Sequence, residues 1–139
     1  MKIRCVHNKV DSENFDERLL KWANTKDELE ISVGKVYVVL AISRYDENYF
    51  YYILSDESID YPLAFPVELF EITDKTLSKY WDCNLDALES FSQLDIEDDE
   101  ICSISEWRNQ KDFFYEKLLD DDNQTVSVFE NYRDKALLE

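Results

Sequence analysis

Carboxylates spaced two residues apart mark the part of the chain with the clearest capacity for chemistry. Asp95, Glu97 and Asp99 fall at the first three ligand positions of a helix–loop–helix calcium loop, and Glu106 falls at its twelfth position. The sixth position holds Glu100, where the sharp turn of such a loop needs glycine. Because 32 of the 139 residues are acidic, matches of this kind arise by chance. We therefore interpret the segment as an acidic loop, solvated or facing a partner, and expect no metal there.

Thiols and an imidazole offer a second kind of chemistry near the N-terminus. Cys5 and His7, the only histidine, fall on one face of an expected strand and could form a nucleophile and its base. Side chains two residues apart on a strand are about 6.5–7 Å apart, which is too far for direct activation. A zinc site would also need Cys83 and Cys102, but the Cys-x-x-Cys spacing typical of such sites is missing. We expect three reduced cysteines without metal.

Catalysis and cofactor binding find little support elsewhere in the chain. Gly34 is the only glycine, so a glycine-rich phosphate-binding loop is excluded. No two of the 32 carboxylates are marked by their spacing as a catalytic acid and base. The sequence therefore predicts a protein that is not an enzyme and carries no cofactor.

Net charge is the most informative bulk property. The formal net charge is −17, with 13 acidic and 8 basic residues in residues 1–70 against 19 and 7 in residues 71–139. Such a surface repels a phosphate backbone, which disfavours direct binding of nucleic acid, and it attracts a basic protein. No apolar run reaches the roughly 18 residues that span a bilayer, and the polar N-terminus does not resemble a signal peptide. We expect a cytoplasmic protein that does not contact a membrane.

Short strands are predicted for the first half of the chain. The expected elements are a strand at Lys2–His7 near a sheet edge, a helix inserted at 12–25, and strands at Lys35–Ile42, Tyr49–Ser55, Tyr61–Phe65 and Phe70–Ile72. Gly34 can adopt a positive φ and turn the chain into the second strand. Pro62 and Pro66 confine the Tyr61–Phe65 strand to an edge or an end, and a single tight turn from Pro66 leads to the last strand.

The spacing within these strands resembles a known family. The pattern Leu29-x-Ile31-x-Val33-Gly34-Lys35-x-Tyr37-x-Val39, then Tyr51-Tyr52-Ile53, then Pro66-x-x-Leu69-Phe70-Glu71, is similar to small bacterial and phage Src-homology-3-like barrel proteins. This resemblance implies a small β-barrel over residues 1–73. The inserted segment of about 20 residues in the first loop departs from the family. So does Tyr52, which stands where the family often has a basic residue.

Helical spacing replaces strand patterns after residue 73. Thr73 or Asp74 can cap a helix that continues to Phe91, and Ser103 has the spacing of a capping box for a second helix that ends near Asp120. The tail 125–138 fits a helix better than a strand. The expected fold class is thus α+β: an SH3-like barrel with an inserted helix, and a helical extension over residues 74–139 packed on it as one compact unit.

Acidic loops and aromatic anchors together suggest a binding function. The expected partner-binding residues are Asp95, Glu97, Asp98, Asp99, Glu100, Trp107, Asp120, Asp121 and Asp122. Barrel proteins decorated with helices resemble some immunity proteins of bacterial polymorphic or contact-dependent toxin systems. We expect a protein that binds and neutralises a cognate toxin, a basic nuclease in the leading interpretation. The alternatives are a phage or mobile-element accessory protein, which binds a host factor or mimics DNA, and a barrel adaptor module.

Overall fold

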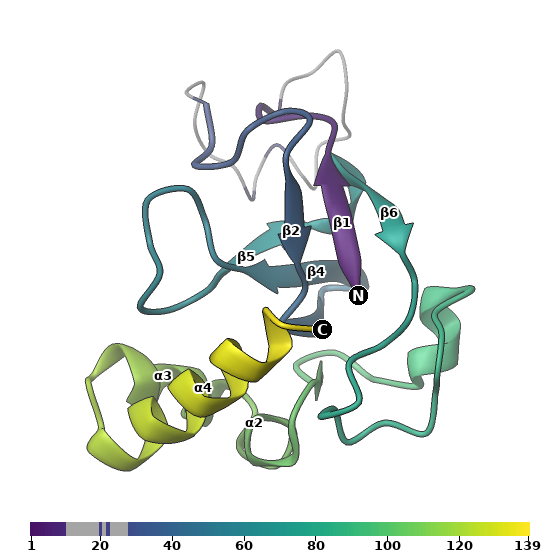
Figure 1. Ribbon diagram of the computed structural model, residues 1–139. Coiled ribbons are helices and arrows are strands. Elements are labelled where there is room, and N and C mark those ends of the chain that lie inside the picture. Colours follow the sequence, from purple (N-terminus) through teal and green to yellow (C-terminus); the bar gives the residue numbers. More distant parts are fainter. Residues whose placement is uncertain (11–19, 21, 23–27) are drawn as a thin grey trace.

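The computed structural model describes residues 1–10, 20, 22 and 28–139, and its described part is an α+β fold (Figure 1). The helix predicted at 12–25 lies outside the described residues, apart from Leu20 and Trp22. Among the described residues, no helix combines the length and the apolar composition needed to cross a bilayer.

A three-stranded antiparallel sheet contains the N-terminus. Strand β1 (Lys2–Cys5) lies between β2 (Val36–Val38) and β6 (Phe70–Asp74). Ile3 is opposite Tyr37 on one side and Ile72 on the other. The expectation of an edge position for β1 is therefore wrong, because both sides of β1 are paired.

A four-stranded antiparallel sheet forms the second layer. Its order is β5 (Leu63–Pro66), β4 (Asn48–Ile53), β3 (Ala41–Tyr45) and β7 (Ile101–Cys102). β5 is an edge strand, as its flanking prolines predict. In Figure 1, β4 and β5 pass behind β1 and β2, which places the two sheets face to face.

The long strand predicted over Lys35–Ile42 is divided between the two sheets. The chain leaves β2 after Val38 and enters β3 at Ala41, and the two residues between them are buried. The Val39 N–H donates to the carbonyl of Met1 at 3.0 Å, and the Leu40 N–H donates to the carbonyl of Tyr52 at 2.8 Å. A continuous apolar run is equally suited to one buried strand or to a buried corner, so the sequence pattern does not reveal the break.

The described strands do not close into a barrel. They form two open sheets, joined by the corner at Val39–Leu40 and by the 3₁₀ turn η1 (Val67–Leu69) between β5 and β6. The tight turn and last strand after Pro66 are confirmed, whereas barrel closure is not.

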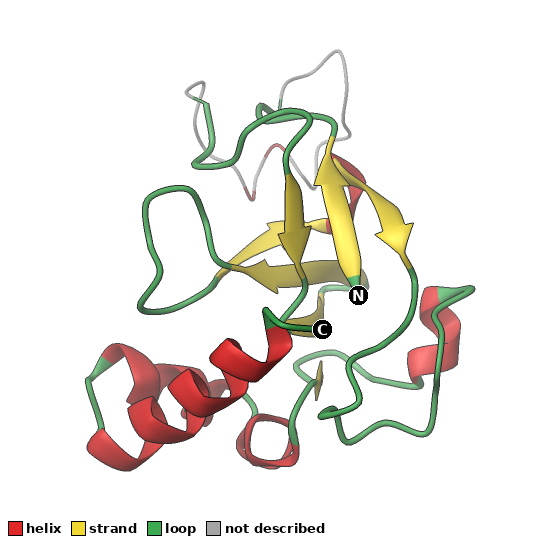
Figure 2. Ribbon diagram, in the orientation of Figure 1, coloured by secondary structure: helices red, strands yellow, loops and turns green. Residues whose placement is uncertain are grey.

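The helix predicted from Thr73 to Phe91 is wrong. Thr76 forms a bridge with Ala87, and Asp74 accepts a hydrogen bond from the Thr76 N–H at 3.0 Å, which turns the chain instead of capping a helix. The segment is mostly loop in Figure 2 and ends in the short 3₁₀ helix η2 (Phe91–Leu94). Leu77, Trp81 and Leu88 are nonetheless buried, so long-range packing overrides their helical spacing.

Three helices complete the chain: α2 (Ser105–Gln110), α3 (Asp112–Leu119) and α4 (Asn123–Ala136). The single helix predicted from Ser103 is thus split at Lys111, whose φ of 54° is left-handed. The helical tail is confirmed by α4.

A buried hydrogen-bond network connects the helical half to the sheet corner. The Leu40 carbonyl accepts hydrogen bonds from Ser103 Oγ at 2.7 Å and from the Tyr132 hydroxyl at 2.6 Å. The Trp81 indole N–H donates to the same Tyr132 hydroxyl at 2.6 Å. The Ser103 hydroxyl is therefore used to satisfy the buried carbonyl of Leu40 at the corner. It does not cap a helix, which is why the predicted capping box does not form.

The loop before β2 is held by one carboxylate. Gly34 has a φ of 88°, as its type predicts, and the loop it turns lies against Asp56. Asp56 accepts hydrogen bonds from Ser32 Oγ at 2.5 Å, Lys35 Nζ at 2.7 Å and the Tyr37 hydroxyl at 2.8 Å. Partial burial raises the pKa of Asp56, but the hydrogen bonds from Lys35, Ser32 and Tyr37 outweigh it and hold the pKa below its ordinary value.

Replacing Asp56 by asparagine should lower the free energy of unfolding at pH 7 by about 1–3 kcal/mol, because hydrogen bonds to a charged group are lost. Since the folded pKa is depressed, the carboxylate's contribution is fully present above its unfolded pKa of about 3.9 and is lost as the pH falls through the folded pKa. Urea unfolding at pH 7 and near pH 3 measures the difference between the two proteins. That difference should shrink at the lower pH, and a constant difference contradicts the assignment; exposed Asp60→Asn is the control.

Candidate protein-binding site

Strand alternation defines an outer face of the four-stranded sheet, directed away from the three-stranded sheet. Tyr51 and Phe65 point toward the three-stranded sheet, where their rings contact Phe70 at centroid distances of 5.7 and 6.4 Å. Their neighbours therefore point to the opposite, outer face. The pairing register places Ser43 opposite Phe50 and Tyr52 opposite Ala64, so these four side chains share that face.

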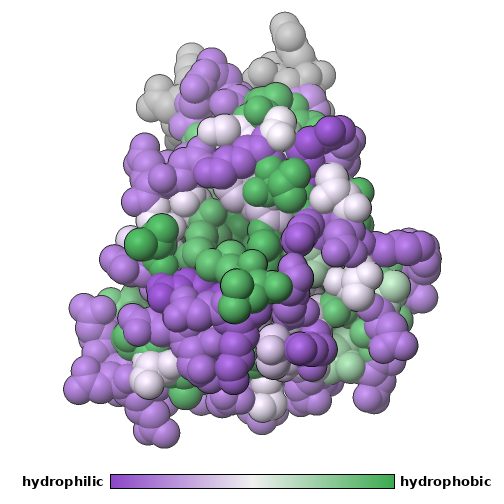
Figure 3. Space-filling view, viewed as in Figure 1, coloured by the Kyte–Doolittle hydropathy of each residue, from purple (hydrophilic) through white to green (hydrophobic). Residues whose placement is uncertain are grey.

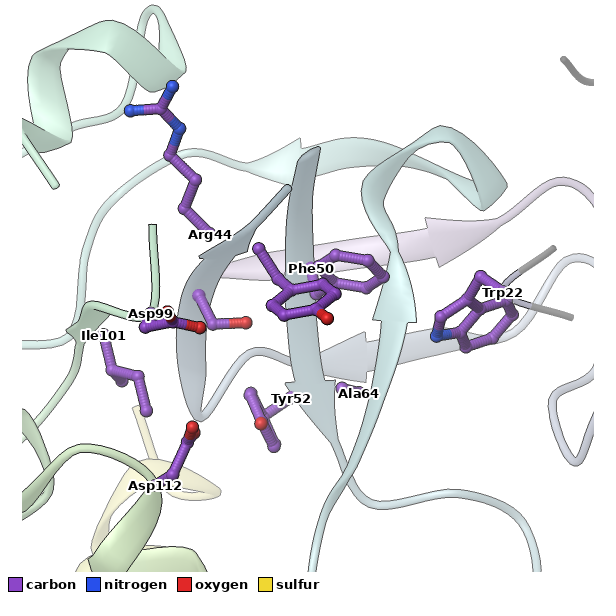
Figure 4. Close-up of a pocket in the computed structure, with 10 residues that line it drawn as sticks. Trp22, Arg44, Phe50, Tyr52, Ala64, Asp99, Ile101 and Asp112 are labelled. Atoms are coloured by element: carbon purple, nitrogen blue, oxygen red, sulfur yellow. The ribbon is translucent and has the colours of Figure 1, made fainter. Parts of the chain in front are cut away.

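A cavity of about 190 Å³ lies on this outer face (Figure 4). Its walls come from β3, β4, β5, β7, the start of α3 and Trp22, and its lining residues are Trp22, Ser43, Arg44, Tyr45, Phe50, Tyr52, Ala64, Asp99, Ile101 and Asp112. We call this the aromatic pocket. Phe50 and Tyr52 form its floor, with 6% and 9% of their surfaces exposed. The Trp22 ring lies 6.2 Å from that of Phe50.

Two exposed carboxylates line the aromatic pocket. Asp99 belongs to the 95–100 loop, which is fixed beside β3 because the Asp99 N–H donates to the Arg44 carbonyl at 2.8 Å and the Arg44 N–H donates to the Glu100 carbonyl at 3.2 Å. Asp112 is the first residue of α3, directly after the left-handed Lys111. The pocket is therefore acidic at one side and aromatic at its base.

Arg44 also lines the pocket, but its charge is directed elsewhere. Figure 4 shows its guanidinium pointing away from the labelled aromatic residues. Arg44 Nε lies 3.3 Å from Asp98 Oδ1, and a second guanidinium nitrogen donates to the Ile96 carbonyl at 3.1 Å. The positive charge is thus neutralised by Asp98, and Asp99 and Asp112 decide the sign of the potential in the pocket.

The phenol of Tyr52 stays neutral in this setting. Burial, and then the nearby Tyr115 and Asp112, raises the pKa of Tyr52 well above its ordinary value. The ring therefore offers an uncharged aromatic face at any physiological pH.

The first predicted acidic cluster lies at the surface beside the pocket. Asp95, Glu97, Asp98 and Asp99 are exposed, and Glu100 is partly buried. The Glu100 side chain accepts a hydrogen bond from the Glu97 N–H at 2.7 Å, which closes the loop on itself.

Two carboxylates that the sequence analysis missed adjoin this loop. The turn between β3 and β4 contains Asp46 and Glu47, with φ of 49° and 64°, and the Glu47 N–H donates to Asp98 Oδ1 at 3.0 Å. Asparagine, aspartate and glycine are the usual residues in such a turn, so Asp46 suits its position, whereas Glu47 carries a conformational cost. We call residues 46–47 and 95–100 together the acidic rim.

The second predicted cluster, Asp120–Asp122, does not join the acidic rim. It lies beyond the end of α3, and the eight residues of that helix span about 12 Å from Asp112, which begins it at the pocket. Asp122 caps α4 by accepting hydrogen bonds from the Thr125 N–H at 3.0 Å and from Thr125 Oγ1 at 2.7 Å. These bonds hold the pKa of Asp122 below its ordinary value, so this residue has a structural role.

Trp107 was predicted to lie in the binding surface, but the structure buries it. It has no exposed surface, and its ring contacts those of Tyr52 and Phe114 at centroid distances of 5.0 and 5.4 Å. It packs between Tyr52 and α3, because the apolar face of α2 turns toward the sheet. Trp107 therefore supports the Tyr52 ring from the side of the helices and is not accessible to a partner.

The aromatic pocket itself was not predicted. In β4, Tyr49 and Tyr51 alternate with Phe50 and Tyr52, so both faces of the strand are aromatic and the pattern does not reveal which one is outside. Asp112 was not predicted as a binding residue, because it does not belong to a cluster of acidic residues in the sequence. Only the strand pairing and the break at Lys111 bring these residues together.

The thiols do not form a reactive site. The three cysteines are free thiols, and Cys5 Sγ donates to the His7 carbonyl at 3.3 Å. Burial, and then the neighbouring Cys83 thiol, raises the pKa of Cys102 to about 12, and burial raises that of Cys5, so both remain protonated at neutral pH. In the part of the chain that the structure describes, no group of three or more His, Cys, Asp or Glu residues could hold a metal ion.

A different surface lies over the three-stranded sheet. Figure 3 shows hydrophobic side chains gathered in the middle of the face that β2 and the C-terminus share in Figure 1. Val36 and Leu138 are exposed in these elements. This central patch is apolar, so it adds nothing to the acidic rim.

Comparison with known proteins finds no match to a protein-family model, a curated protein or a solved structure.

Proposed function

We propose that this protein binds and inhibits a basic protein, as the immunity protein of a bacterial toxin system, and that the toxin is a basic nuclease. One observation carries the proposal: the acidic rim adjoins, through Asp99, a preformed pocket lined by aromatic side chains. An acidic field attracts a basic partner from a distance, while buried aromatic contacts slow its release. Binding rather than catalysis is the proposed mode of action.

Electrostatics supports a protein partner over nucleic acid. The formal charge of −17 repels phosphates, and among the described residues the acidic rim forms one ion pair, that of Asp98 with Arg44. A nuclease has a basic surface for its own substrate, and carboxylates placed over that surface would block substrate access.

Two finer features belong to the same proposal. We regard residues 1–73 as an open relative of the SH3-like barrel, which the antiparallel strands and the turn η1 before β6 support. We place the protein in the cytoplasm, a setting in which its three free thiols stay reduced.

The proposal is tested by capturing the partner from a lysate and then measuring inhibition of its nuclease activity. The tagged protein should retain a basic protein from a lysate of its source strain at low salt, and mass spectrometry should identify that protein. The purified partner should lose its nuclease activity at a one-to-one ratio with this protein. A captured partner that is acidic, or whose activity is unchanged in the complex, contradicts the proposal.

A further inference from the structure

We propose that the aromatic pocket is the receptor for a single arginine side chain of the partner. The inference rests on the proposed function, because it takes the partner to be a basic protein, and it adds which chemical group is recognised and where. The pocket is lined by the rings of Trp22, Phe50 and Tyr52 and by the carboxylates of Asp99 and Asp112.

The volume of the pocket matches a single inserted side chain. Its volume of about 190 Å³ equals roughly six water molecules at about 30 Å³ each. Pockets for nucleotide-sized or drug-sized ligands begin near 300 Å³. One long side chain inserted from a partner fits this volume, whereas a whole cofactor does not.

The chemistry of the walls selects a cation. Aromatic faces attract a cation placed over them, and tryptophan and tyrosine do so most strongly. Asp99 and Asp112 approach from different elements, the 95–100 loop and the start of α3, so they can accept hydrogen bonds from different edges of one planar group. Guanidinium combines a flat face with five N–H donors, which suits this arrangement better than the compact ammonium of lysine.

Arg44, the one basic side chain among the described lining residues, does not fill the pocket with its charge. Arg44 turns its guanidinium away, toward Asp98 and the Ile96 carbonyl, and only its remaining atoms line the wall. Asp99 and Asp112 form no ion pair with a described residue, so an incoming arginine would meet two exposed carboxylates at the pocket.

A titration with N-acetylarginine amide, followed by NMR of the full chain, tests the inference. The expected shifts are at Trp22, Phe50, Tyr52 and Asp112, with a dissociation constant in the millimolar range. The citrulline analogue has the same shape without charge and should bind about tenfold more weakly, as the loss of one cation–π and charge contact requires. The lysine analogue should lie between the two.

Two double variants are compared. The test variant combines Asp99→Asn and Asp112→Asn, and the control variant combines Asp120→Asn and Asp121→Asn. Both pairs remove two charges, and asparagine tolerates the left-handed backbone of Asp99 and Asp121. The first pair should weaken binding of the arginine probe about tenfold, and the control should leave it unchanged. Thermal unfolding confirms that each variant is folded.

Three outcomes overturn the inference: no shifts at the pocket, equal binding of the citrulline analogue, or equal weakening by both pairs of substitutions. If the arginine probe fails but the captured nuclease is still inhibited, only the pocket assignment is wrong. If the probe binds as expected and no captured protein is inhibited, the proposed function fails and the pocket assignment stands.

Discussion

Replacing Trp107 by alanine should lower the free energy of unfolding by about 3–5 kcal/mol. The side chain has no exposed surface, and its ring is enclosed by Tyr52, Phe114 and Tyr115 at centroid distances of 5.0, 5.4 and 6.2 Å. Removal leaves a large cavity between the outer sheet face and the helices. Because the whole stability of a domain is about 5–15 kcal/mol, urea unfolding should show a midpoint far below that of the native protein.

Two further variants test whether lost packing is the cause of the lower stability of Trp107→Ala. Trp107→Phe should lower the free energy of unfolding less than Trp107→Ala does. It keeps an aromatic ring and removes an indole N–H that has no hydrogen-bond partner among the described residues. Phe113→Ala is the matched control: this aromatic residue is 57% exposed, and its loss should change stability by at most about 0.5 kcal/mol. Similar losses for Trp107→Ala and Phe113→Ala would contradict the burial of Trp107.

Removing three charges from the acidic rim should slow association with the basic partner about ten- to hundredfold at low salt, because steering depends on the local field. The chosen changes are Asp95→Asn, Glu97→Gln and Asp99→Asn, whose side chains are exposed. Asp98 and Glu100 are kept, because their carboxylates hold the loop through the Glu47 and Glu97 N–H groups. Stopped-flow association measured across a salt series gives the rate.

The matched control removes three charges near the other end of α3: Glu116→Gln, Asp120→Asn and Asp121→Asn. It should slow association much less, since those carboxylates lie away from the acidic rim. The difference between the two triple variants should vanish near 1 M salt, where the Debye length is about 3 Å. Equal slowing by both variants would mean that overall charge, and not this surface, attracts the partner.

Much of the fold follows from local sequence patterns. Gly34 predicts a positive φ, the prolines around β5 predict an edge strand, and the tail pattern predicts α4; all three are confirmed. Each depends on the conformation of a few adjacent residues, which steric preference and helical periodicity determine directly. The acidity of the surface is likewise a property of composition alone.

The tertiary structure alone decides what lies inside and what lies at the site. Trp107 and Phe113 both lie in the helix predicted from Ser103, yet one is fully buried and the other exposed. Phe50 and Tyr51 are adjacent aromatic residues that point to opposite faces, and only the pairing of β4 with its neighbours assigns the outer one to the pocket. Asp99 and Asp112 meet there because loop and helix contacts bring them together across 13 positions of sequence. Local patterns specify short features such as the Gly34 turn, the β5 edge and α4, whereas the loop conformation of 75–90 and the side of a strand that faces solvent depend on contacts between residues far apart in the chain.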